Sequence, residues 1–163
     1  MIITVDLLKL NEKTDFGNLF TDEDAKLILN KFMIRHPVYG QLDPKDNSPG
    51  FPHVSHFIDK IWIEYNYIWG NIKILNTPDG KVLKALIGDE NLFEGLKAKN
   101  RDLKIDSILN DEDKYYKYIY ASDILKEKGL YISLRGTTLQ GKLNNFFTFD
   151  IRTYDRETLF IEK

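Results

Sequence analysis

The sequence predicts one α+β domain over residues 1–163, with a mostly antiparallel β core surrounded by helices. Residues 54–65 and 67–76 are adjacent runs rich in Ile, Trp and Tyr, which is the pattern of a β-hairpin. Two later runs, 130–135 and 143–152, also have strand character. Segments with helical spacing lie between these runs, and no repeat or linker divides the chain. Helices and hairpins that alternate in this way favour a single mixed domain.

In the first third of the chain we expect a strand over residues 2–8 and then a helix. Thr21-Asp-Glu-Asp24 matches the start signal of a helix, and the apolar residues that follow share one helical face to about Met33. Residues 37–43 are expected to be extended. Pro44-Lys-Asp-Asn-Ser-Pro-Gly50 is predicted to be a loop from its composition.

After the predicted hairpin, Thr77-Pro-Asp-Gly80 is predicted to be a turn, because proline presets φ and glycine relieves the end of the turn. The apolar residues of segment 82–87 then have helical spacing. The run Tyr115-Tyr-Lys-Tyr-Ile-Tyr120 is consistent with a strand or with an exposed aromatic patch. Ser122 is expected to cap a short helix that Gly129 ends.

Composition excludes several classes of protein. Hydrophobic residues make up 42% of the chain, with ten Phe and nine Tyr, which is enough to build a core. The net charge is −2, and no basic stripe or basic amphipathic helix indicates a nucleic acid or a membrane surface as partner. There is no cysteine, so disulfides, cysteine zinc sites and thiol catalysis are excluded together.

The first residues indicate a soluble, intracellular protein. Met-Ile-Ile-Thr-Val-Asp-Leu-Leu is apolar but has no basic residue and reaches Asp6 early, which is typical of a strand rather than a signal peptide. No apolar run approaches the roughly 20 residues that a membrane-spanning helix needs. We therefore expect neither secretion nor membrane insertion.

Three residues in strand-like segments have the chemistry of a serine hydrolase triad. They are His56 in His53-Val-Ser-His56, Ser133 in Gly129-Leu-Tyr-Ile-Ser-Leu-Arg-Gly136, and Asp150 in Phe147-Thr-Phe-Asp-Ile151. Base, nucleophile and carboxylate are recognised by their roles and not by their order in the chain. Arg135 and Gly136 follow the serine, and a glycine there would let backbone N–H groups turn toward an oxyanion.

Each of these residues also has a structural interpretation. Alternation places His56 on an apolar face, where a histidine is by default part of the core. A serine within a strand is commonly a tolerated small polar residue. Asp150 is equally consistent with an ion pair to Arg152 or to another surface base.

No cofactor or metal is expected. His36 precedes a proline, and His53 points away from His56 in a regular strand, so the two histidines of segment 53–56 do not form a metal site. The aspartates are scattered without calcium-loop spacing. The sequence also lacks a phosphate-binding glycine loop and a dinucleotide fingerprint.

Five segments of the chain form a pattern in a fixed order. They are Gly40-Gln-Leu-Asp43, Val54-Ser-His-Phe-Ile58 with Ile61-Trp62, Trp69-Gly-Asn-Ile-Lys-Ile-Leu-Asn-Thr-Pro-Asp-Gly80, Tyr131-Ile-Ser-Leu-Arg-Gly136 and Phe147-Thr-Phe-Asp-Ile151. Taken together, these segments resemble the prohead core serine proteases of tailed bacteriophages, particularly the T4-like group. The resemblance covers roughly residues 38–87 and 129–155. Five phrases in one order are hard to obtain by chance.

The resemblance implies a fold shared with herpesvirus assembly proteases, a closed, mostly antiparallel β barrel ringed by helices. It implies cleavage of scaffold, capsid and internal core proteins inside the prohead, in the host cytoplasm, with self-cleavage and a homodimer as further expectations. His56 would be the general base, Ser133 the nucleophile and Asp150 the third member. Arg135 and Gly136 would lie beside the oxyanion.

The chain also departs from the family pattern. Gln41 and Pro44 replace the usual Glu and His, and Leu134 replaces a second serine, so Ser133 is the nucleophile available in this strand. After Asp150 the sequence is Arg-Thr-Tyr-Asp-Arg-Glu-Thr rather than Val-Ser-x-Pro-Ser. Residues 88–122 are interpreted as an insertion because this part is longer than usual.

Two alternatives to an active endopeptidase remain open. The first is a catalytically inactive, protease-like structural or scaffold component of the prohead, which the altered flanks of Asp150 and the change at Gln41 favour. The second is an intracellular binding module whose Tyr115–Tyr120 patch meets a partner. The first alternative predicts no reaction of the serine, and the second predicts that His56 and Ser133 are dispensable.

Overall fold

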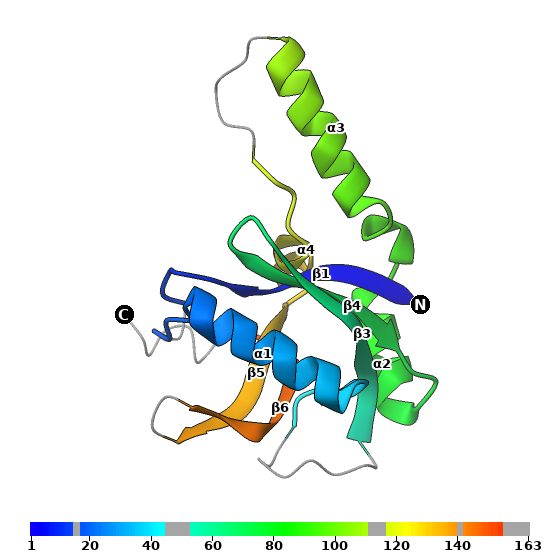
Figure 1. Cartoon of the computed structure of the whole chain (residues 1–163). Coiled ribbons are helices and arrows are strands. Elements are labelled where there is room, and N and C mark those ends of the chain that lie inside the picture. The colour runs from blue at the N-terminus through cyan, green and yellow to red at the C-terminus, as the bar shows by residue number, and fades with distance from the viewer. Residues whose placement is uncertain (15–16, 45–52, 111–116, 140–141, 155–163) are drawn as a thin grey trace.

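The computed structural model describes residues 1–14, 17–44, 53–110, 117–139 and 142–154. Within these ranges the chain forms two antiparallel sheets and four α-helices (Figure 1), a mixed architecture that agrees with the predicted antiparallel β core and surrounding helices. The elements are β1 (Ile2–Lys9), α1 (Asp22–Arg35), β2 (Val38–Gln41), β3 (Val54–Glu64), β4 (Tyr67–Ile74), α2 (Pro78–Ile87), the 3₁₀ helix η2 (Glu90–Leu92), α3 (Leu96–Leu109), α4 (Ala121–Glu127), β5 (Leu130–Leu139) and β6 (Lys142–Thr153).

The larger sheet has the strand order β1-β4-β3-β2. The predicted hairpin is confirmed as β3 and β4, joined by Tyr65 and Asn66, which have φ values of 51° and 59°. Positive φ at both central residues gives a two-residue loop the twist that its strands require. The ends of β3 and β4 that carry Trp62 and Trp69 therefore lie next to each other beside this turn.

The smaller sheet pairs β5 with β6, which confirms the two strands predicted near the C-terminal end. α1 packs on β3 and β6, α2 packs on β3 and β4, and α4 lies against β1 and β5. The predicted start of α1 is also confirmed, because Thr21 and Asp24 form a reciprocal capping box. Apolar side chains from both sheets and from α1, α2 and α4 form one core.

No closed barrel is found among the described strands, so the barrel expected from the resemblance is not observed. The two sheets meet where β2 runs beside β6, and their backbone pairing there is a single parallel bridge, Leu42 to Ile151. Two further backbone groups at this contact are bonded by side chains: Gln41 N donates to the carboxylate of Asp150, and Phe149 O is bonded to the ring of His56. These bonds join the two sheets without a continuous ladder.

The turn predicted at residues 77–80 is wrong, because this segment begins α2. Thr77 is the N-cap, and its Oγ1 accepts a hydrogen bond from Gly80 N at 3.0 Å. Pro78 occupies the first helical position, where its missing N–H costs nothing. Thr-Pro is therefore a helix start here, and of the four periodic apolar residues that follow, Leu83 and Ile87 are buried.

The polar region after α2 contains α3, which extends away from the sheets (Figure 1). Residues 117–120 are neither strand nor helix, while Tyr115 and Tyr116 lie outside the described residues. Ser122 lies inside the first turn of α4 rather than at its cap, and donates from N and Oγ to the buried carboxylate of Asp6. None of the described helices has the length and apolarity that crossing a membrane requires.

Candidate functional site

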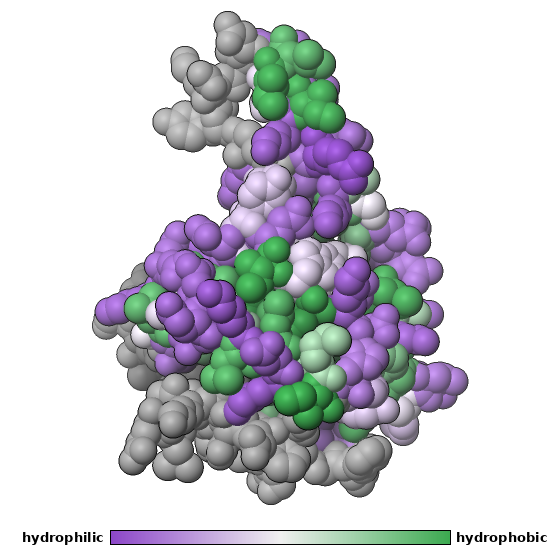
Figure 2. All heavy atoms as spheres, in the orientation of Figure 1, coloured by the Kyte–Doolittle hydropathy of each residue, from purple (hydrophilic) through white to green (hydrophobic). Residues whose placement is uncertain are grey.

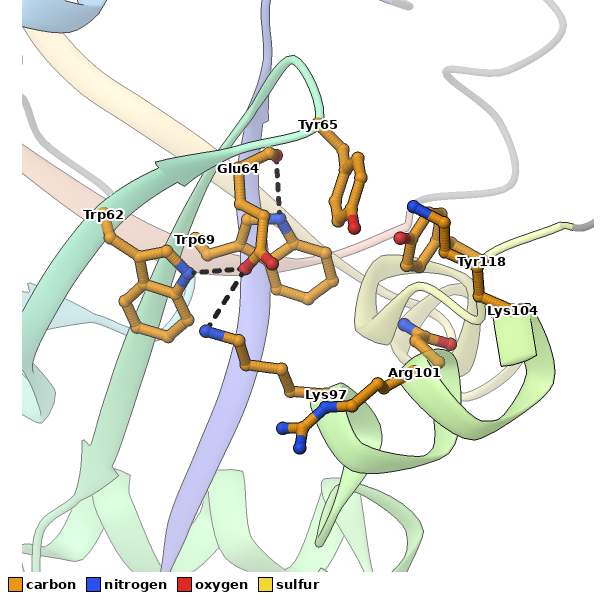
Figure 3. A pocket seen from close by; sticks show the side chains of 9 residues that line it. Trp62, Glu64, Tyr65, Trp69, Lys97, Arg101, Lys104 and Tyr118 are labelled. Carbon is orange, nitrogen blue, oxygen red and sulfur yellow. Dashed lines mark hydrogen bonds and ion pairs between the residues drawn. The ribbon is translucent and has the colours of Figure 1, made fainter.

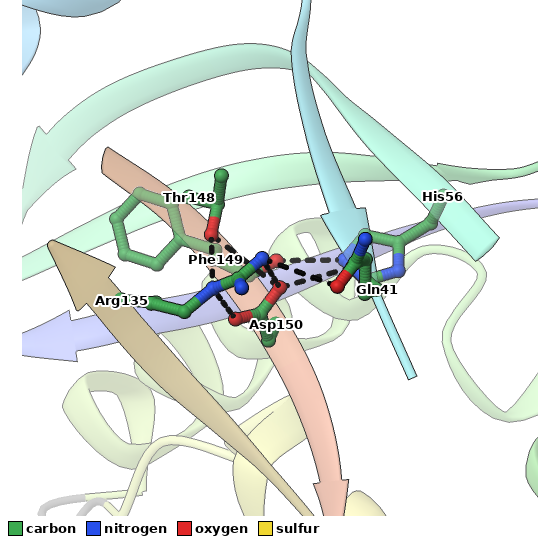
Figure 4. A network of polar contacts seen from close by, with 6 residues as sticks. All are labelled: Gln41, His56, Arg135, Thr148, Phe149 and Asp150. Atoms are coloured by element: carbon green, nitrogen blue, oxygen red, sulfur yellow. Dashed lines mark hydrogen bonds and ion pairs between the residues drawn. The ribbon is translucent and has the colours of Figure 1, made fainter. Parts of the chain in front are cut away.

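His56 lies in the middle of the contact between β2, β3 and β6, and its side chain is fully buried (Figure 4). Its Nδ1 is 2.8 Å from the hydroxyl of Ser55, and its Nε2 is 2.8 Å from the carbonyl oxygen of Phe149. Gly40 is the residue opposite His56 on β2. A Cβ at Gly40 would lie 2.2 Å from His56 Nε2 and 2.2 Å from Phe149 O, so the ring fits only beside a glycine.

These contacts define the protonation of His56. A carbonyl oxygen can only accept, so Nε2 carries the proton and Nδ1 accepts from the Ser55 hydroxyl. Burial lowers the pKa of His56 from 6.5 to about 4, opposed by the hydrogen bond to Phe149. The imidazole is therefore neutral near pH 7, with both nitrogens engaged.

Asp150 follows Phe149 in β6 and, like His56, is fully buried. Its Oδ1 accepts a hydrogen bond from Gln41 N at 3.0 Å, and its Oδ2 lies 2.7 Å from Nε of Arg135. Arg135 also donates to the side-chain oxygen of Gln41 and to Thr148 Oγ1, each at 3.3 Å. Figure 4 shows these side chains as one cluster between β5, β6 and β2.

In this cluster, burial and polar contacts have opposite effects on the ionisation of Asp150. Burial raises the pKa of Asp150, while the N–H of Gln41 and the guanidinium of Arg135 oppose the increase. Within the described residues, Asp150 Oδ2 has its ion pair but no hydrogen bond of good geometry, and Nε of Arg152 has no hydrogen-bond partner. Arg135 is thus the principal cation that compensates the charge of the buried Asp150 carboxylate.

Ser133 is directly opposite Asp150 in the β5–β6 register, so the two side chains are on one face of the sheet. Its side chain is half-buried, and Gly136, three residues along, is exposed next to a register shift in the pair. A nucleophile and its base need heavy atoms within about 2.6–3.2 Å. Among the described residues, the groups at that distance from the His56 nitrogens are those of Ser55 and Phe149.

The structure therefore brings together Ser133, Arg135 and Asp150, whereas the imidazole of His56 is bonded elsewhere. His56 and Asp150 act as links between the sheets, each bonding a backbone group of the opposite sheet. We call the contacts of Gly40, Gln41, His56, Phe149 and Asp150 the β2–β6 seam. The ion pair anticipated for Asp150 is present, but its partner is Arg135 rather than Arg152.

Two members of this network, Ser55 and Thr148, were missed from sequence alone, and Gln41 was noticed only as a departure from the family pattern. Thr148 shares the alternating face of Asp150, and Ser55 is adjacent to His56, so both were within reach of a closer pattern analysis. The role of Gln41 depends on its backbone N–H and on a contact 109 residues away in the chain. No local pattern in the sequence indicates such a contact.

The other histidines lie apart from the seam. His36 is exposed and bonds the carbonyl oxygen of Asp59 at 2.6 Å, and His53 is exposed with Nδ1 3.3 Å from Asp79. In the described part of the chain, no group of three or more His, Asp or Glu side chains is arranged to hold a metal ion.

Comparison with known proteins assigns no family. No family model matches the chain, and neither a curated protein nor a solved structure is significantly similar to it. The resemblance to prohead proteases thus remains a prediction carried by the five short segments.

Proposed function

We propose that this chain is a protease-like domain that serves as a non-catalytic structural component of a phage prohead. The observation that carries the proposal is the enclosure of His56, whose two nitrogens are bonded to Ser55 and to Phe149 in a fully buried position. A general base must accept a proton from its nucleophile, and this imidazole has no nitrogen left for Ser133. Its lowered pKa also makes it a weak base.

The sequence departures support the same proposal. In the segment where the resembled proteases carry Glu and His, this chain has Gln41 and Pro44. Gln41 uses its backbone N–H and its side chain to bind the Asp150–Arg135 pair. Proline has no side-chain proton to transfer. The segment therefore contributes to the seam and not to acid–base chemistry.

The fold is proposed to be an opened form of the assembly-protease barrel. Two observed contacts support this proposal: β2 runs beside β6 at one side, and β1 contacts β5 at the other. Bonds between side chains and backbone at the seam replace the ladder that would close it. Such a fold would keep the surface of a protease while its interior served only stability.

The second candidate is an active capsid-maturation serine endopeptidase that cleaves scaffold, capsid and core proteins, with Ser133 as nucleophile. It is favoured by the direct register of Ser133 with Asp150 and by the neighbouring Arg135. For this mechanism His56 would have to leave Phe149 when substrate binds and turn toward Ser133. The two candidates therefore differ in whether Ser133 ever becomes nucleophilic.

The deciding experiment treats the purified wild-type chain and Ser133→Ala with a fluorophosphonate that acylates activated serines, followed by intact mass. Our proposal expects no adduct on either protein, with both folded by circular dichroism. It also expects both to co-sediment equally with phage head and scaffold proteins co-expressed with this chain. A stoichiometric adduct on wild type that is absent from Ser133→Ala would overturn the proposal and establish the peptidase.

A further inference from the structure

A second cluster of chemically distinctive side chains lies far from the seam, in a cleft between α3 and the turn end of the β3–β4 hairpin (Figure 3). We call it the α3 cleft. Four aromatic residues, three basic residues, one asparagine and one glutamate line it: Trp62, Glu64, Tyr65, Trp69, Lys97, Asn100, Arg101, Lys104 and Tyr118. Its volume is about 120 Å³, close to the size of one aromatic ring.

The indole N–H groups of the cleft are already satisfied. Trp62 Nε1 donates to the carboxylate of Glu64, and Trp69 Nε1 donates to the backbone oxygen of Glu64, both at 3.2 Å. The rings are thereby fixed, and they offer faces and edges rather than donors to a ligand. Fixed aromatic walls around a ring-sized space favour a planar apolar group.

The helical wall of the cleft is basic. Lys97, Arg101 and Lys104 are spaced i, i+4 and i+7, so they share one face of α3. Lys97 Nζ lies 3.4 Å from the Glu64 carboxylate, and Lys104 Nζ lies over the ring of Tyr65 at 5.5 Å. Arg101 has no ion pair or hydrogen bond within the described residues. One carboxylate thus faces three cations, and the excess charge would attract an anion.

The surface beyond the cleft is apolar. Along α3 the exposed fractions of Ile105, Ile108 and Leu109 are 47%, 68% and 75%. Figure 2 shows a green hydrophobic patch at the far end of the helix, beyond a purple hydrophilic stretch. Aliphatic side chains in this position suit a polypeptide, because a nucleic acid backbone would leave them exposed to water. The net charge of −2 also disfavours a nucleic acid partner.

We propose that the α3 cleft binds an acidic peptide segment of a partner protein, with an aromatic side chain in the cleft and neighbouring carboxylates on Arg101 and Lys104. Aliphatic residues of the same segment would cover the far end of α3. This inference does not depend on whether Ser133 is catalytic, since the cleft and the seam share no residue.

Both tryptophans of the chain line this cleft, so tryptophan fluorescence reports binding without background from elsewhere. The experiment titrates the full chain with the synthetic peptide Asp-Asp-Phe-Asp-Asp-Leu and, separately, with the same peptide carrying Asn for Asp. We expect a saturable change in emission with the acidic peptide, weakened by raising the salt from about 0.05 M to about 0.5 M. The Asn peptide should bind at least about tenfold more weakly.

Charge reversals on α3 then locate the site. Arg101→Glu or Lys104→Glu should weaken the acidic peptide about tenfold or more. Lys99→Glu makes the same charge change at an exposed position of α3 that does not line the cleft, and should stay within about twofold. All variants are checked for folding by circular dichroism.

Three outcomes would overturn the proposal. The first is no change in emission at about 5 mM acidic peptide, which would leave the site without measurable affinity. The second is an equal loss of affinity in Lys99→Glu, which would mean that only the overall charge matters. The third is tighter binding of a ten-nucleotide oligothymidylate, in competition with the peptide, which would assign the cleft to single-stranded nucleic acid.

Discussion

The β2–β6 seam and the α3 cleft both contain residues that proteins use for chemistry, yet they differ in access. His56 and Asp150 are fully buried in the seam, and each bonds a backbone group of the opposite sheet as well as a neighbouring side chain. In the cleft, Tyr65 is 48% exposed and Arg101 has no partner within the described residues. Buried polar groups with satisfied bonds specify a fold, whereas accessible groups without partners can bind something else. This difference in access underlies our two proposals, a stabilising role for the seam and a recognition role for the cleft.

The largest effect is expected from Gly40→Ala. A Cβ there would meet His56 Nε2 and the backbone oxygen of Phe149, each at 2.2 Å, and a backbone atom cannot move aside easily. Overpacking together with loss of the buried hydrogen bond should lower the free energy of unfolding by about 4 kcal/mol. Urea unfolding followed by circular dichroism measures this change.

The matched control for this substitution is Gly17→Ala, where an added Cβ meets nothing within 4 Å but φ is 79°. Strain at a positive φ alone should cost about 1 kcal/mol. If the two variants lose similar stability, the seam is loosely packed and its contrast with the cleft disappears.

The next effect concerns Arg135→Met, which removes the cation beside a fully buried carboxylate. Leaving Asp150 without its ion pair should cost about 3 kcal/mol, because the carboxylate remains buried and has lost its main compensation. Adding Asp150→Asn in the Arg135→Met background should recover part of the loss, since a neutral amide does not need the cation. A double-mutant cycle from urea unfolding gives the coupling, and additive losses would mean that the pair does not interact.

His56 makes stability depend on pH in a defined window. Its pKa is 6.5 when unfolded and about 4 when folded, so the unfolded state binds more protons between these values. The contribution of neutral His56 is therefore present above pH 6.5 and is lost as the pH falls toward 4. From pH 7 to pH 5 the free energy of unfolding should fall by about 2 kcal/mol from this group alone.

The comparison protein for this measurement is His56→Gln, which cannot titrate. The raised pKa values of Asp6 and Asp150 give stability changes of opposite sign, but both proteins share them, so the difference between wild type and variant isolates His56. A difference that stays constant from pH 7 to pH 5 would show that the imidazole protonates freely in the folded state, as an accessible catalytic base would.

The sequence predicted most of the fold because its signals were local. Runs rich in Ile, Trp and Tyr located β3 and β4, strand-like runs located β5 and β6, and the capping pattern at Thr21 located the start of α1. The error at residues 77–80 arose because Thr-Pro begins a turn or a helix with the same local chemistry, and the burial of Leu83 and Ile87 against the sheet decides for the helix. The local signals for a turn and for a helix start are thus the same at this segment, and only tertiary contacts distinguish the two.

The seam and the cleft were harder to predict because they depend on contacts between distant segments. Residue types indicated His56 and Asp150, but not that their partners would be backbone groups of the other sheet. The cleft joins a hairpin turn to a helix more than 30 residues later, within a stretch that resembled only a polar insertion. The sequence pattern indicates side chains that such sites use, but the fold determines which groups those side chains contact.

The smallest effect should come from Lys97→Met, which tests whether the cleft is held together as tightly as the seam. Lys97 is 59% exposed in its pair with Glu64 and lies over the Trp62 ring at 5.5 Å, so water screens both interactions. Methionine keeps the apolar stem of the side chain, and the free energy of unfolding should change by less than about 1 kcal/mol. A loss as large as that of Arg135→Met would mean that α3 depends on this contact, and the cleft would then be structural like the seam. A small loss would leave α3 and its basic face free to exchange their present contacts for those of a ligand.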